Sequence, residues 1–118
     1  MIIHDAFMLK RMERALKLGG DLFSLEDIAK ELNEGTMLGH VENDTWAVTR
    51  VHDWPRKRSV DVLFVVGNLE GSLLLEKKIA DWAKSQNASL ITATGRDGWW
   101  KYRVDGWKKT GTLYSKDV

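Results

Sequence analysis

Residues Val60 to Val66, with the sequence VDVLFVV, form a nearly continuous apolar run that is rich in β-branched side chains. Such a run is typical of a strand that is buried on both faces. After Gly67-Asn68, apolar residues recur at the spacing of one helical face: Leu75, Ile79, Trp82 and Ala83. A buried strand that leads into an amphipathic helix is half of a β-α-β unit, and the turn between the two often binds anions.

The length and composition limit the classes of protein that remain. The chain has 118 residues, so we expect residues 1–118 to form one domain with a substantial core. The net charge is only +1, so the overall charge does not point to a nucleic-acid or membrane partner. The chain has no cysteine, which excludes disulfides and thiolate metal sites. No apolar run approaches the roughly 20 residues that span a bilayer, and the N-terminus does not have the pattern of a signal peptide. We therefore expect no membrane partner.

Two amphipathic helices are predicted at the start of the chain. The first spans Asp5 to Leu18, with Asp5 as its N-cap and Gly19-Gly20 ending it. The second spans Ser24 to Asn33, where Ser24 and Asp27 form a loose capping box. Their predicted buried faces are Met8, Met12, Ala15 and Leu16 in the first helix, and Leu25, Ile28, Ala29 and Leu32 in the second.

Neither helix indicates a nucleic-acid partner. The second helix resembles the first helix of a helix-turn-helix, but that motif requires a recognition helix three or four residues later. The sequence after Gly35 alternates like a strand instead. The basic residues of the first helix are Lys10, Arg11, Arg14 and Lys17. They are typical of a solvated face, and Glu13 interrupts the basic patch.

A β-hairpin is predicted next, from Met37 to Glu42 and from Thr45 to His52, with its turn at Asn43-Asp44. A two-residue turn places His40 opposite Ala47. His40 and His52 then lie far apart along the hairpin, so the sequence predicts no metal site.

The rest of the chain completes a mixed sheet. Ala88 to Thr94 is predicted to be a strand parallel to Val60 to Val66, because a helix connects them. A short helix from Asp97 to Val104 and a last strand from Trp107 to Lys116, with a bulge at Gly111, are predicted to follow. The fold class is α/β (α+β), with two N-terminal helices, one crossover helix and a short C-terminal helix around a mixed central sheet.

This order of elements resembles the GNAT fold of the N-acetyltransferases. Two stretches, TWAVTRVHDWPRKRSVDVLFVVGN and DWAKSQNASLITATGRDGWWKYRVDGWKK, further resemble small GNAT-like proteins encoded by tailed bacteriophages. The resemblance covers about Phe23 to Lys116. It implies a role in the virion or in morphogenesis, a location in the virion or the host cytoplasm, and other phage structural proteins or a host protein as partners.

The resemblance also implies where acetyl-CoA would bind. In the family, a loop of the form Q/R-x-x-G-x-G/A before the long helix holds the pyrophosphate through backbone N–H groups. The matching cofactor-binding candidates are Val65, Val66, Gly67, Asn68, Gly71 and Ser72. This sequence lacks the Gln or Arg and one glycine of the pair, and Glu70 brings a carboxylate to the place of the phosphates.

The resemblance implies one catalytic residue. Many family members use a tyrosine in Y-x-x-x-G-F as the general acid that protonates the leaving thiolate. Tyr102 holds that place here, with Trp107 in the place of the phenylalanine. A packing role for Tyr102 is the alternative. No general base stands out, although Glu42 and His52 lie near strand ends.

The altered phosphate loop favours a non-catalytic interaction module without a bound cofactor. The alternative is an acetyl-CoA-dependent N-acetyltransferase with an atypical cofactor loop. The order of elements and Tyr102 support this second hypothesis.

Overall fold

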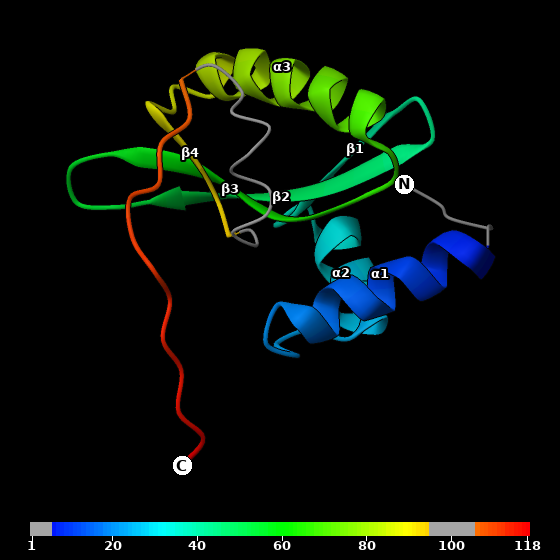
Figure 1. Cartoon of the computed structure of the whole chain (residues 1–118). Helices are drawn as coiled ribbons and strands as arrows, with labels where there is room; N and C mark the ends of the chain where they lie inside the picture. The colour runs from blue at the N-terminus through cyan, green and yellow to red at the C-terminus, as the bar shows by residue number, and fades with distance from the viewer. Residues whose placement is uncertain (1–5, 95–105) are drawn as a thin grey trace.

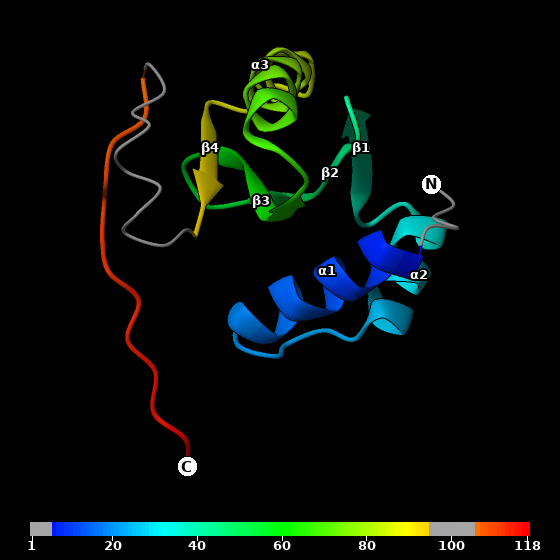
Figure 2. The same ribbon diagram turned by 45° about the vertical axis from the view of Figure 1, so that its right-hand side comes forward.

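The computed structural model describes residues 6–94 and 106–118 of the chain. These residues form a four-stranded sheet between two layers of helix (Figures 1 and 2). The elements in chain order are α1 (Ala6–Leu18), α2 (Leu25–Glu34), β1 (Leu38–Glu42), β2 (Thr45–Asp53), β3 (Arg58–Val66), α3 (Leu69–Ser85) and β4 (Leu90–Ala93). Helix α3 covers one face of the sheet, and α1 and α2 lie on the other (Figure 1).

The sheet is mixed, as the sequence predicts. Its strand order is β1-β2-β3-β4, with antiparallel pairing up to β3 and parallel pairing between β3 and β4. His40 pairs with Ala47, which confirms the predicted two-residue turn of the hairpin. The connection from β3 to β4 runs through α3, so the predicted crossover unit is also confirmed.

The core lies on both faces of β3. On the α3 side, one cluster contains Ala47, Val60, Leu75, Ile79 and Ala83. On the other side, the cluster contains Met8, Met12, Leu16, Ile28, Met37, Val48, Phe64 and Val66. Burial of apolar surface stabilises the folded state by roughly 25 cal/mol per Å². Because β3 contributes side chains to both clusters, it helps to hold both layers of helix against the sheet.

A β-bulge interrupts β3 near its middle. Val48 pairs with Phe64, but the next residue of β2, Thr49, pairs with Val62, so Leu63 is the extra residue. Leu63 and Phe64 consequently pack on the same side of the sheet, against the cluster under α1 and α2. A bulge of this kind bends the strand and increases its twist.

The ends of α2 follow the predicted capping chemistry. The side chain of Ser24 accepts a hydrogen bond from the backbone of Asp27, and the Asp27 carboxylate accepts one from the backbone of Ser24. Hydrogen bonding of the Asp27 carboxylate to the backbone N–H of Ser24 and, to a smaller extent, to the Ser24 side chain holds the pKa of Asp27 below its usual value. One assignment on this helix is wrong, because Ala29 is exposed while Ile28 is buried. The predicted N-cap of α1, Asp5, lies outside the described residues.

The predicted last strand, Trp107 to Lys116, is wrong. Residues 106–118 contain neither helix nor strand, and the segment leaves the sheet (Figure 1). Leu113 and Tyr114 are 80% and 87% exposed, so the segment buries too little apolar surface to offset the entropy of ordering it. The predicted short helix, Asp97 to Val104, lies wholly outside the residues that the structure describes.

The longest helix that the structure describes is α3, with 17 residues. Across residues 6–94 and 106–118, no helix combines the length and the apolar character needed to cross a membrane.

Candidate functional site

The turn between β3 and α3 is capped by its own side chains. Asn68 is the N-cap of α3, and its Oδ1 accepts a hydrogen bond of 2.7 Å from the backbone N–H of Gly71. The first N–H groups of a helix have no partner inside the helix. Within the described part of the chain, nothing accepts a hydrogen bond from the N–H groups of Leu69 and Glu70, so these two donors are left at the start of α3.

Thr45 lies directly beneath this turn and explains both of its glycines. Its side chain is fully buried, and its Oγ1 accepts a hydrogen bond of 3.2 Å from the backbone N–H of Asn68. A Cβ atom on Gly67 would lie 2.6 Å from Thr45 Cα, and one on Gly71 would lie 2.6 Å from Thr45 Cβ. Gly67 also has a φ of +144°, which L side chains rarely adopt. Both glycines therefore let α3 begin close against the β1–β2 hairpin.

The six predicted cofactor-binding residues lie together at the end of β3 and the first turn of α3. Val66 belongs to the cluster under α1 and α2, and Val65 packs against the cluster under α3. Their side chains are therefore part of the core, and only their backbone groups can meet a ligand. Asn68 is exposed and Ser72 is half-buried.

Among the described residues, the second half of β3 has no partner strand on the side of β4, and we call this stretch its free edge. Strand β4 pairs with Ser59 to Val62 and ends there. Beyond that point β3 continues from Leu63 to Val66, and no described residue pairs with this stretch on the side of β4. At roughly 3.3 Å per residue, the free edge is about 13 Å long. It runs from the bulge to the start of α3.

Asp61 lies where the pairing of β3 and β4 comes to an end. Val60 and Val62 pack on the α3 side, so the side chain of Asp61 between them points to the opposite face. Its Oδ1 accepts hydrogen bonds of 2.7 Å from Ser59 Oγ and of 2.7 Å from Thr92 Oγ1. The sequence analysis missed this carboxylate, although Asp61 is the one polar residue in the apolar run VDVLFVV.

The two predicted base candidates lie at opposite ends of the hairpin. Glu42 forms an ion pair with Lys78 of α3. His52 pairs in register with Ser59 and stacks on Trp54 with 4.0 Å between ring centroids. The indole N–H of Trp54 donates to Ser59 Oγ, so His52 belongs to the group of side chains around Asp61, and Glu42 does not. The predicted general acid, Tyr102, lies outside the described residues.

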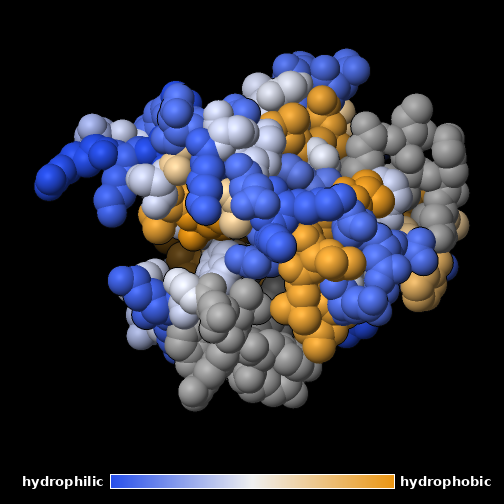
Figure 3. Space-filling view, turned by 90° about the horizontal axis from the view of Figure 1, so that it is seen from above, coloured by the Kyte–Doolittle hydropathy of each residue, from blue (hydrophilic) through white to orange (hydrophobic). Residues whose placement is uncertain are grey.

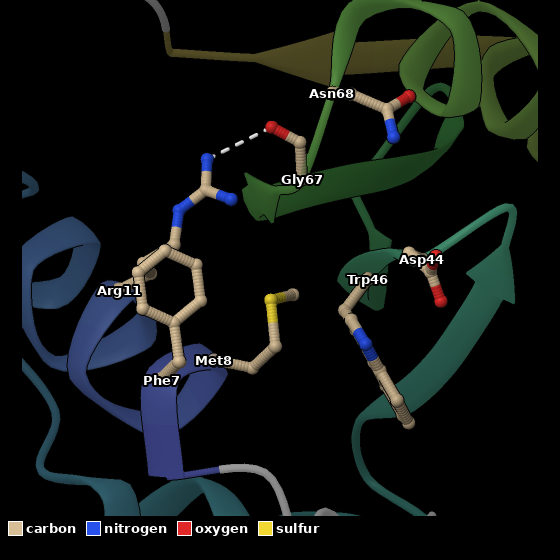
Figure 4. Close-up of a pocket in the computed structure, with 7 residues that line it drawn as sticks. All are labelled: Phe7, Met8, Arg11, Asp44, Trp46, Gly67 and Asn68. Carbon is tan, nitrogen blue, oxygen red and sulfur yellow. Dashed lines mark hydrogen bonds between the residues drawn. The ribbon is translucent and has the colours of Figure 1, made fainter.

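A pocket of about 400 Å³ opens beside the β3–α3 turn, on the side of α1 (Figure 4). The residues that line it are Phe7, Met8, Arg11, Asp44, Trp46, Gly67 and Asn68. Arg11 reaches the turn, because its Nη2 donates a hydrogen bond of 2.8 Å to the carbonyl of Gly67. The sequence analysis placed Arg11 on a solvated face. Its spacing from Met8 and Ala15, at three and four residues, is the signal that places it beside the buried face.

The remaining histidine of the hairpin has a packing role. His40 Nε2 lies 2.8 Å from Thr49 Oγ1, and its ring meets Trp82 edge-on with 5.3 Å between centroids. Burial lowers the pKa of His40 below its usual value. In the part of the chain that the structure describes, no three His, Asp or Glu side chains gather as metal ligands would.

Comparison with known proteins places this geometry in a known fold. No family model matches the chain, and no curated protein matches it. The crystal structure of an acetyltransferase from Trypanosoma brucei superposes with a TM-score of 0.62 and 13% identity, covering 90% of this chain and 92% of that one. The chain has the acetyltransferase fold. A second crystal structure, of a protein described as a probable acetyltransferase, gives a TM-score of 0.59 and 13% identity over 95% of this chain and 92% of that one.

The predicted GNAT-like fold is thus confirmed. At 13% identity the likeness concerns the fold alone. The comparisons do not bear on a bacteriophage origin, which stays a prediction.

Proposed function

We propose that the protein binds acetyl-CoA along the free edge of β3 and transfers its acetyl group to an amine. The observation that carries this proposal is the free edge itself. In a chain with the acetyltransferase fold, Leu63 to Val66 lead from the carboxylate of Asp61 to the unpaired N–H groups at the start of α3.

Different groups of the chain would contact different parts of acetyl-CoA along this edge. At the start of α3, the N–H groups of Leu69 and Glu70 and the partial positive charge of the helix suit the phosphates of acetyl-CoA. Along Leu63 to Val66, the backbone N–H and C=O groups of a strand edge suit an extended ligand arm that carries amides. The thioester supplies the activated acetyl group. This acetyl group would then lie near Asp61, at the end of the free edge that is farther from α3.

Asp61 is the residue to which we assign the proton of the acceptor amine. An ammonium group must lose a proton before its nitrogen can attack the thioester carbon, and a positioned carboxylate can accept that proton directly or through water. When the C–N bond forms, the C–S bond breaks, and the leaving thiolate takes up a proton. Tyr102 remains the predicted donor of that second proton.

One residue in the first turn of α3 is unfavourable for phosphate binding. Glu70 is exposed in the first turn of α3, where its charge stabilises the helix but repels phosphate. The Glu70→Gln change removes this repulsion and keeps the length of the side chain. We therefore expect Glu70→Gln to bind acetyl-CoA several-fold more tightly than the unchanged protein.

Calorimetric titration with acetyl-CoA tests the proposal. We expect saturable binding by the unchanged protein, with a micromolar dissociation constant. No heat and no thermal shift at millimolar acetyl-CoA would contradict it.

The Asp61→Asn variant tests the assigned chemistry separately from binding. Both hydrogen bonds of Asp61 go to Oδ1, an atom that asparagine keeps, so the local structure should persist. We expect acetyl-CoA to bind Asp61→Asn as before, while acetyl transfer to amines falls by a factor of roughly 10² to 10⁴. Unchanged transfer would remove Asp61 from the mechanism.

A second candidate is a non-catalytic interaction module, as a virion-associated or morphogenesis protein with phage structural proteins or a host protein as partners. The packing of both turn glycines on Thr45 favours it, because that packing explains them without a ligand. Three leucines of α3 are also exposed, namely Leu69, Leu73 and Leu74. The surface seen from the α3 side carries apolar patches between hydrophilic ones (Figure 3). Mass spectrometry of purified virions tests this candidate, and absence of the protein would contradict a virion role.

A further inference from the structure

We infer that Arg11 of α1 supplies the cation that faces the phosphates of acetyl-CoA, in place of the Gln or Arg that the turn itself lacks. The inference rests on the proposed function and adds one residue to it. Arg11 lies on a different element from the turn, fifty-six residues earlier in the chain, and reaches it through space.

The position of Arg11 beside the turn is well defined. Its guanidinium donates to the carbonyl of Gly67 at 2.8 Å, and its Cζ lies 5.7 Å from the centre of the Phe7 ring (Figure 4). The side chain is half-buried, whereas Lys10, Arg14 and Lys17 of the same helix are exposed. Arg11 is therefore the cation of α1 that the fold holds against the turn.

Among the residues that the structure describes, no carboxylate lies close enough to neutralise the charge of Arg11. Within residues 6–94 and 106–118, no Asp or Glu oxygen comes within ion-pair distance of it. Asp44 lines the same pocket but lies on the opposite wall, beyond Trp46 (Figure 4). A guanidinium has five N–H donors, and the one carbonyl of Gly67 leaves most of them for another acceptor. Partial burial of a cation costs desolvation free energy, and an anionic ligand beside the cation would compensate for that cost.

The chemistry of the pocket selects the phosphate end of the ligand. Its wall includes Gly67 and Asn68, which precede α3 directly, whereas Asp61 lies six residues before Gly67 along β3, about 20 Å away at roughly 3.3 Å per residue. A thioester at Asp61 therefore could not also reach this pocket. Arginine binds phosphate oxygens with two parallel hydrogen bonds, which suits a pyrophosphate beside the turn.

The experiment compares four proteins: the unchanged chain and the variants Arg11→Met, Arg11→Lys and Arg14→Met. Each is titrated calorimetrically with acetyl-CoA and with S-acetylpantetheine, which has the same thioester and arm but no phosphate. Charge-assisted hydrogen bonds of this kind are worth a factor of roughly ten to a hundred in affinity. We expect Arg11→Met to lose that factor for acetyl-CoA and to bind S-acetylpantetheine unchanged.

The controls separate charge from packing. Arg11→Lys keeps the charge, so we expect it to retain more acetyl-CoA affinity than Arg11→Met. Arg14→Met removes an exposed cation from the same helix, so we expect it to bind like the unchanged protein at moderate salt. Equal losses for both ligands in Arg11→Met would assign Arg11 a structural role and overturn the inference.

Two further outcomes distinguish the inference from the function on which it rests. If the unchanged protein and Arg11→Met bind acetyl-CoA equally, the inference fails and the proposed function stands. If the unchanged protein binds no acetyl-CoA, both fail. Should Arg11→Met not fold, the Nε–H resonance of Arg11 in the unchanged protein provides the readout. A shift on addition of CoA supports the inference, and an unmoved resonance overturns it.

Discussion

Thr45 shows how one buried residue fixes the local geometry of the candidate site. It packs against both glycines of the β3–α3 turn and accepts a hydrogen bond from Asn68. The sequence shows that these glycines are present, but it cannot show what approaches them, because Thr45 is 22 and 26 residues away along the chain. Spacing alone could assign them to a ligand as readily as to a neighbouring strand. Asp61, by contrast, was missed although the sequence does carry a signal for it, because it is the one charge within an apolar run.

Gly71→Ala should destabilise the protein. A Cβ at this position would lie 2.6 Å from Thr45 Cβ and 2.9 Å from the carbonyl oxygen of Glu42, so the start of α3 must shift away from the hairpin. Overpacking of this kind costs about 1–3 kcal/mol in the free energy of unfolding, measured by urea denaturation. The matched control is Gly111→Ala, where a new Cβ meets nothing within 4 Å. Equal stability of the two variants would contradict the packing role of Gly71.

His40 should make stability depend on pH below neutrality. Burial lowers its pKa in the folded protein, so the unfolded chain binds a proton more readily as the pH falls below about 6.5. The free energy of unfolding should therefore decrease between pH 7 and pH 5. The His40→Gln variant should show a smaller decrease over this range. A steeper decrease in His40→Gln than in the unchanged protein would contradict the sign.

At the scale of elements, the periodic segments were predictable and the C-terminal segment was not. Strand β3 and helix α3 follow their patterns closely, because burial on two faces or on one stripe determines which residues are apolar. The capping box of α2 is equally local. The segment from Trp107 to Lys116 has strand-like residues, but a strand also needs a neighbour to pair with, and spacing cannot supply one. The free edge of β3 was unpredictable for the same reason.

Removal of residues 112–118 should leave the fold intact. Leu113 and Tyr114 are almost fully exposed, and Trp107, which donates a hydrogen bond of 3.1 Å to Glu76, is retained. We expect the free energy of unfolding to change by less than about 0.5 kcal/mol, measured by urea denaturation. A loss of several kcal/mol would show that the segment packs against the sheet after all.

For the whole molecule, the sequence predicted the fold better than it predicted the function. The order of elements led to the acetyltransferase fold, and the superposed crystal structures confirm it. The site depends on groups from distant segments: the cation of Arg11 comes from α1, the carboxylate of Asp61 from the first half of β3, and Gly67 from the turn after β3. A fold can support several functions, so the site must be tested on its own residues.

The most direct test of the proposed site is a titration of the isotopically labelled protein with acetyl-CoA, followed through its backbone amide resonances. We predict saturable shifts in the amides of Leu63 to Ser72, together with those around Arg11, and little change in the exposed segment 112–118. Saturable shifts confined to other elements, or no shifts at millimolar acetyl-CoA, would contradict binding at the free edge of β3.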